Sequence, residues 1–155
     1  LVPTIKDGDF VLWESNSIMR YLNAKYGNGK LLPASPEGMA NANRWMDWQL
    51  SAFNPIIVPL FFATVRTAPE KRDPQMIQAA LDKAIKAWQT VEDQLTKHQF
   101  LGGDEFSLGD IPLGVWAYRW FNLPIDRPKQ ANIERWYDCL KQHEPYRTHI
   151  MIPVT

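Results

Sequence analysis

Cysteine is nearly absent from this chain, which has a single one, Cys139, among 155 residues. One cysteine cannot form a disulfide within the chain and fits a reducing compartment, so we expect a cytoplasmic protein. The chain also lacks an excess of either charge, because 17 basic side chains balance 17 acidic ones. Without a basic patch, a run of Lys or Arg, or zinc-finger spacing, we do not expect nucleic acid as a partner.

Long apolar runs are also missing from the sequence. Residues 55–65 are apolar, but this stretch is interrupted by Pro55 and Pro59 and is shorter than the roughly 18 residues of a membrane span, so we expect no membrane partner. The three histidines show neither metal-ligand nor catalytic-triad spacing, and we expect no metal. Tryptophan, by contrast, is frequent, with 7 residues, and predicts a substantial core.

Residues 1–29 have the pattern of a strand, a turn, a strand and a helix. Apolar runs at 2–5 and 10–13 flank Asp7-Gly8, a turn signal that predicts a β-hairpin. The following residues repeat apolar side chains at helical spacing, with Ser15 as the expected N-cap.

The remainder of the sequence is predicted to be helical. Residues 30–36 resemble a linker, and residues 37–155 carry helical periodicity broken by loops. Helices are expected at about 39–53, 77–95, 107–121 and 133–140. Pro55 and Pro59 should kink or divide the chain after the first of them. The predicted architecture is a small α/β piece followed by an all-α piece.

The sequence opens within a strand-like segment and with Leu1 rather than Met. We therefore expect residues upstream of Leu1. A hairpin and one helix cannot cover both faces of a sheet, so we expect a further segment, or another chain, to complete the α/β piece.

Three motifs, taken in order and at these separations, resemble the cytosolic glutathione transferases. They are Val2-Pro3, Glu14-Ser15 and Ser107-Leu108-Gly109-Asp110. The resemblance extends over the whole chain and is closest to bacterial, theta- and beta-like members. It implies an incomplete thioredoxin-like, glutathione-binding domain over 1–29, a linker over 30–36 and the all-α transferase domain over 37–155.

The resemblance also implies a glutathione site at the hairpin and the start of the helix. The Val2-Pro3 bond would be cis, and the Val2 backbone would pair with the cysteinyl part of glutathione. Ser15 would take the γ-glutamyl carboxylate, and Glu14 would offset its ammonium group. From pattern alone, an ordinary trans Val2-Pro3 bond is the more common case, and so is a Ser15 that only caps the helix beside a solvated Glu14.

The Ser107 to Asp110 motif has the form of a capping box, with Asp in place of Glu. We interpret it as structural rather than catalytic. Loss of the Asp110 side chain is expected to cost about 1–3 kcal/mol, because a cap and a buried hydrogen-bond acceptor are removed.

For the electrophile, the resemblance implies a pocket between the helices at 39–53 and 107–121. We assign it Trp48, Trp116 and Arg119, although aromatic residues at helical spacing are more often part of a core. Cys139 has no basic neighbour to lower its pKa, and we interpret it as an idle thiol.

The expected function is transfer of the glutathione thiolate to small apolar electrophiles, with glutathione as co-substrate. The hydroxyl or thiol that activates the sulfur in this family precedes Leu1 in position, so no catalytic residue is assigned. Two alternatives remain open: a glutathione-dependent disulfide reductase or peroxidase, and a non-catalytic dimerisation module of the same fold. The family resemblance further implies a homodimer, in which Arg20 or Arg44 would serve a subunit contact.

Overall fold

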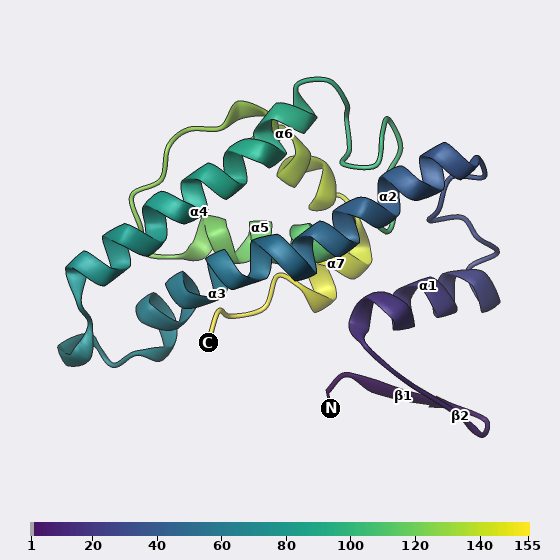
Figure 1. Ribbon diagram of the computed structural model, residues 1–155, viewed down its shortest axis with the longest axis horizontal. Coiled ribbons are helices and arrows are strands. Elements are labelled where there is room, and N and C mark those ends of the chain that lie inside the picture. Colours follow the sequence, from purple (N-terminus) through teal and green to yellow (C-terminus); the bar gives the residue numbers. More distant parts are fainter. Residues whose placement is uncertain (1) are drawn as a thin grey trace.

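The computed structural model describes residues 2–155 and begins with a β-hairpin (Figure 1). Strand β1 (Thr4–Asp7) pairs antiparallel with β2 (Phe10–Trp13), and Thr4 lies opposite Trp13. Gly8 turns the chain with φ 61°, a conformation that glycine adopts at little cost. The first strand starts later than the predicted 2–5, because Pro3 has no amide to donate to a strand ladder.

Helix α1 (Ser15–Lys25) is attached to the hairpin turn through one carboxylate oxygen. Oδ2 of Asp7 accepts hydrogen bonds from the Tyr21 hydroxyl at 2.7 Å, Lys25 Nζ at 2.7 Å and the Tyr26 hydroxyl at 2.6 Å. The hydrogen bond from Lys25, followed by those from the tyrosines, lowers the pKa of Asp7 well below its ordinary value. The turn is thereby fixed against the end of α1.

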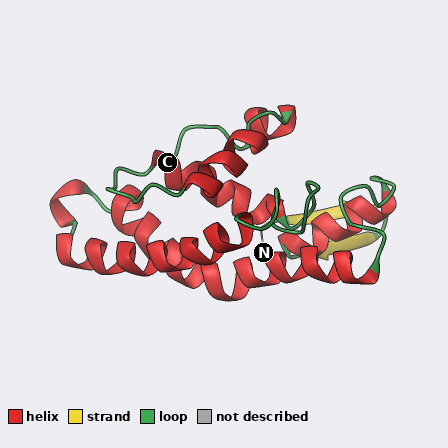
Figure 2. Ribbon diagram, turned by 90° about the horizontal axis from the view of Figure 1, so that it is seen from above, coloured by secondary structure: helices red, strands yellow, loops and turns green. Residues whose placement is uncertain are grey.

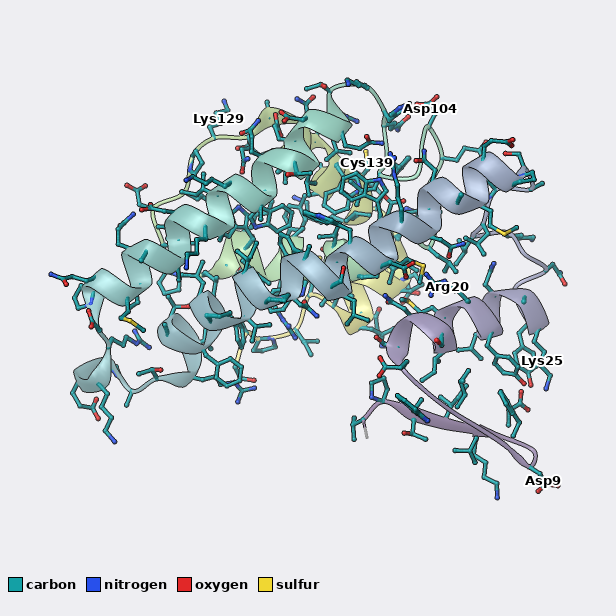
Figure 3. The ribbon with its side chains drawn as sticks, viewed as in Figure 1. Asp9, Arg20, Lys25, Asp104, Lys129 and Cys139 are labelled. Atoms are coloured by element: carbon teal, nitrogen blue, oxygen red, sulfur yellow. The ribbon has the colours of Figure 1, made fainter. Side chains whose placement is uncertain are left out.

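Helix α1 packs along α2 (Pro36–Trp48), whose N-cap is Ser35. Arg20 points from α1 toward α2 (Figure 3) and donates to Asn43 Oδ1 at 2.6 Å and Asp47 Oδ1 at 2.7 Å. The buried Asn16 side chain donates to the Met46 carbonyl at 2.8 Å. Arg20, one of the residues considered for a subunit contact, therefore bonds within its own chain.

The prolines were predicted to kink or divide the chain after residue 53, and the structure shows that they do not divide it. Helix α2 continues through a π-helical turn (Gln49–Phe53) into α3 (Asn54–Phe61) and a second π-helical turn (Phe62–Arg66). Pro55 follows the first π turn, and Pro59 lies within α3, so both prolines are inside the continuous helix.

The continuous helix over Pro36–Arg66 is long and apolar enough, by length and composition alone, to cross a membrane. The sequence analysis found only the short apolar run at 55–65, whereas the structure includes that run in one helix of 31 residues. Core helices of soluble proteins meet the same criterion, and here Phe53, Ile57 and Leu60 are buried in the helical core. Packing within the protein therefore accounts for the apolar character of its buried face.

Four further helices complete the all-helical part (Figures 1 and 2). They are α4 (Pro74–Leu95), α5 (Asp110–Asn122), α6 (Ala131–Leu140) and α7 (Glu144–His149). A 3₁₀ turn (Pro69–Lys71) precedes α4. The core between these helices is centred on the fully buried Trp88, Trp120 and Trp136. The hairpin lies at one end of the molecule, outside this core (Figure 2).

Candidate functional site

The first half of the predicted site lies where the hairpin meets α1. The Val2-Pro3 bond is cis, and the side chains of both residues are exposed. Glu14 occupies the N-cap position of α1 with φ 74° and ψ 112°, and no side chain caps this helix end. The prediction that Ser15 is the N-cap is therefore wrong by one residue, since Ser15 is the first residue of the helix.

The positive φ of Glu14 has a consequence for the helix start. The chain turns sharply from β2 into α1, and the exposed Ser15 lies in the first turn of that helix. The amides of Ser15 and Asn16 have no carbonyl partner within the helix, and the first turn contains no acidic side chain. A helix start of this kind presents partial positive charge, which favours an anionic group.

Asn16 is a structural residue that the sequence analysis missed. Its side chain is 5% exposed, and its hydrogen bond to the Met46 carbonyl holds the first turn of α1 on α2. A polar residue between two serines gives no periodic signal, so only the tertiary contact identifies its role.

The second half of the predicted site is a cleft between α3 and α5. The cleft has a volume of about 410 Å³ and is lined by Val58, Phe61, Phe62, Arg66, Trp116 and Arg119. The Trp116 indole donates to Asn54 Oδ1 at 2.8 Å, which fixes the orientation of the ring. Trp116 and Arg119, two of the three residues assigned to the electrophile pocket, both line this cleft, which lies beside residues 58–66 rather than beside the predicted 39–53.

Trp48, the third residue assigned to that pocket, does not line the cleft. Its ring packs against Trp45 at 5.4 Å and Phe53 at 5.5 Å between ring centroids. Arg66 and Phe61 line the cleft instead. Phe61 and Arg66 were not predicted to line the cleft, because the sequence analysis expected a kink or break at Pro55. The helix is continuous, and it carries these residues to the cleft.

The Arg119 guanidinium lies over two aromatic rings, 4.8 Å from the centroid of Trp116 and 5.2 Å from that of Phe61. Burial lowers the pKa of Arg119, and the positive charge of Arg66 lowers it further. Arg66 lines the same cleft, so two guanidinium groups share it.

The Ser107 to Asp110 motif stabilises the helical part away from both halves of the site. Helix α5 begins at Asp110 rather than at the predicted 107, and Ser107 to Gly109 form the turn before it. Asp110 Oδ2 accepts from the Ser107 amide at 2.9 Å and its hydroxyl at 3.2 Å. Burial raises the pKa of Asp110, and its hydrogen bonds oppose that shift.

Two bonds to Asp110 were not anticipated. Asp110 Oδ1 accepts from the Leu101 amide at 2.9 Å and from the Trp136 indole at 2.9 Å. The carboxylate therefore connects the loop before α5, the start of α5 and the middle of α6. Asp110 therefore has a structural role.

Cys139 lies half-buried on α6 (Figure 3), distant in the chain from the residues assigned to the site. Within residues 2–155, no group of three or more His, Cys, Asp or Glu side chains is arranged to hold a metal ion.

Comparison with known proteins gives consistent matches along the chain. Residues 74–139 match the family model described as glutathione S-transferase, C-terminal domain. The glutathione S-transferase GstB of Escherichia coli K12 is 36% identical over 157 aligned residues, which cover 100% of this chain and 76% of that protein.

Solved structures agree with the sequence matches. The apo theta-class glutathione S-transferase of Xanthomonas axonopodis pv. citri superposes with a TM-score of 0.95 at 40% identity, over 100% of this chain and 81% of that one. The same enzyme with glutathione bound gives a TM-score of 0.95 at 40% identity, over 100% of this chain and 74% of that one.

Proposed function

The chain belongs to the glutathione S-transferase family, and we propose that its hairpin and the start of α1 bind glutathione while the α3–α5 cleft receives the electrophile. The protein is a glutathione transferase, as its relatives of 36–40% identity over the full chain are. The observation that carries the binding proposal is the uncapped, acid-free start of α1 at the exposed Ser15.

The γ-glutamyl and cysteinyl parts of glutathione have chemical counterparts at this junction. The γ-glutamyl carboxylate suits the Ser15 hydroxyl and the first amides of α1, which carry the positive end of the helix dipole. The γ-glutamyl ammonium suits the exposed Glu14 carboxylate. The exposed Val2 backbone suits the cysteinyl unit, because one amide and one carbonyl can pair with a peptide as a strand does.

The chemistry follows from the thiol of glutathione. Its thiolate is the nucleophile, and a bound thiol reacts faster at neutral pH when its pKa is lowered. The thiolate attacks the electrophilic carbon, a C–S bond forms, and the leaving group departs with its bonding electrons. The residues described above bind and orient the two substrates, and no residue among them is assigned to thiol activation.

Substitution Ser15→Ala tests the glutathione site. It removes one hydrogen bond to a carboxylate, so the Kd for glutathione should rise roughly tenfold. Ser17→Ala is the matched control, because Ser17 is also exposed on the first turns of α1 but is not assigned to the site. Titration calorimetry measures both values. Equal affinities in the two variants would remove Ser15 from the binding site.

The oligomeric state and the compartment are part of the same proposal. A homodimer is supported by the family resemblance and by exposed apolar side chains such as Phe10, Trp13 and Leu50. A cytoplasmic location is supported by the single cysteine. Light scattering on the purified protein should give twice the chain mass, and a monomeric mass at micromolar concentration would contradict the dimer.

A further inference from the structure

Two arginines at the α3–α5 cleft, Arg66 and Arg119, form no ion pair with the residues that the structure describes. Within residues 2–155, the ion pairs involve Arg20, Lys25, His98 and Lys141, and none includes Arg66 or Arg119. Neither guanidinium makes a hydrogen bond within the described part of the chain, whereas Arg127 donates to the carbonyls of Trp120, Leu123 and Phe121. Arg66 and Arg119 therefore keep their donors available on the surface of a cleft.

The arrangement around these arginines is asymmetric. The aromatic rings of Phe61 and Trp116 lie beneath Arg119, which is half-buried, while Arg66 is exposed at the end of the second π turn. A second cleft of about 260 Å³ also includes both arginines, together with His149, Ile150 and residues 152–155. Both guanidiniums thus border two adjoining clefts with aromatic walls.

Placing two positive charges near each other is unfavourable unless an anion joins them. Arg66 lowers the pKa of Arg119, which is the electrostatic sign of that repulsion. Guanidinium groups bind carboxylates through paired, charge-assisted hydrogen bonds, and these are stronger where water is partly excluded. A carboxylate between the two arginines would relieve their repulsion and satisfy their donors.

From this geometry we infer that Arg66 and Arg119 form a subsite for the carboxylate of an anionic aromatic electrophile, whose ring lies against the exposed Phe62 in the same cleft. The inference rests on the proposed function, since it assigns a substrate class to the electrophile cleft of the transferase. The volume of about 410 Å³ falls within the range of small-molecule pockets, roughly 300–1,000 Å³.

The corresponding reaction is a substitution on an activated aryl halide. With 4-chloro-3,5-dinitrobenzoate, the glutathione sulfur bonds to the ring carbon that carries chlorine. The C–Cl bond then breaks, chloride leaves with the electron pair, and the thiol proton passes to solvent. The carboxylate is not consumed, so its role is binding and orientation.

A binding experiment tests the subsite without glutathione or turnover. The probes are 3,5-dinitrobenzoate and its neutral analogue 3,5-dinitrobenzamide, which share the ring and differ in charge. Quenching of tryptophan fluorescence, to which Trp116 contributes, reports both Kd values. The wild-type protein should bind the benzoate roughly tenfold more tightly than the amide, and this preference should weaken at high salt.

Two variants assign the preference to the arginines. Arg66→Gln and Arg119→Gln should each reduce the ratio of benzoate to amide affinity several-fold, while Lys83→Gln, an exposed residue on α4, should leave that ratio unchanged. Arg66→Gln is informative even if Arg119→Gln fails to fold, because Arg66 is exposed. Equal binding of the two probes by the wild type, or an unchanged ratio in Arg66→Gln, would overturn the inference.

Turnover separates the inference from the function on which it rests. The ratio of kcat/KM for 4-chloro-3,5-dinitrobenzoate to that for 4-chloro-3,5-dinitrobenzamide, each divided by its uncatalysed rate, should fall in Arg66→Gln through a higher KM for the benzoate. If the benzoate binds selectively but neither compound is conjugated, the subsite stands and the function assigned to this cleft fails. If both are conjugated at equal normalised rates, the function stands and the subsite is wrong.

Discussion

Asp110 provides a quantitative test of how the helical part is held together. Its side chain is fully buried and accepts four hydrogen bonds, from the Leu101 amide, the Ser107 amide and hydroxyl, and the Trp136 indole. In Asp110→Ala, the two amides and the indole lose their acceptor inside the protein. Each buried unpaired donor costs about 1–3 kcal/mol, which gives a gross loss of about 3–9 kcal/mol.

Part of this loss is recovered, because a buried carboxylate is itself costly by several kcal/mol. We therefore expect Asp110→Ala to lower the free energy of unfolding by about 3 kcal/mol, at the upper end of the range expected from the capping box alone. For a protein of 155 residues this corresponds to a fall in Tm of roughly 6–12 °C.

Urea unfolding followed by tryptophan fluorescence measures the free energy directly. Asp104→Ala is the matched control, because the Asp104 side chain is 81% exposed and lies in the same loop region before α5 (Figure 3). The control should change stability by no more than about 0.5 kcal/mol. An Asp110→Ala midpoint equal to that of the control would refute the buried-network reasoning.

Two further predictions concern the hairpin and the contact between α2 and α5. The pKa of Asp7 is depressed in the folded protein, so its contribution to stability is present above the ordinary Asp pKa of about 3.9 and is lost as pH falls through the lower folded value. The difference in unfolding free energy between wild type and Asp7→Asn should therefore shrink from pH 7 to pH 3 in urea titrations, and an equal difference at both would exclude a role for the charge. In Gly109→Ala, the new Cβ would lie 2.9 Å from the Ala42 carbonyl oxygen and 3.2 Å from its Cα, so overpacking should cost about 1–3 kcal/mol. Thermal unfolding measures this loss, and an unchanged Tm would show that α2 can move away from the new Cβ without loss of stability.

Local sequence signals anticipated much of the fold. The Asp7-Gly8 turn and the long periodic helix seen as α4 depend on neighbours in sequence, and both are present. The cis bond at Val2-Pro3 is also present, but it was expected from the family resemblance, since most X-Pro bonds are trans. The helix through Pro55 was missed, because the prediction treated proline as a break and a π turn leaves no periodic signature.

The candidate site was less accessible from sequence than the fold. Trp116 and Arg119 lie on the same helix, so their proximity could be anticipated. Arg66 comes close to them only because α2, α3 and the two π turns form one continuous helix, which the sequence did not predict. Trp48 was assigned to the cleft from its helix alone, but its ring packs on Trp45 and Phe53. The Trp136 bond to Asp110 joins residues far apart in sequence, which no local pattern reports.

The wide turn at Gln49–Phe53 fixes the angular phase of everything that follows it in the same helix. One residue more or fewer in an α-helix rotates the downstream side chains by about 100° about the axis. Because a π turn holds one residue more than an α turn, deleting a single residue from it would let the helix close up as regular α with Phe61 and Arg66 still facing the cleft. An insertion or deletion in the regular α-helical part before Phe61 has no such turn to absorb it, so it would rotate Phe61 and Arg66 away from the cleft.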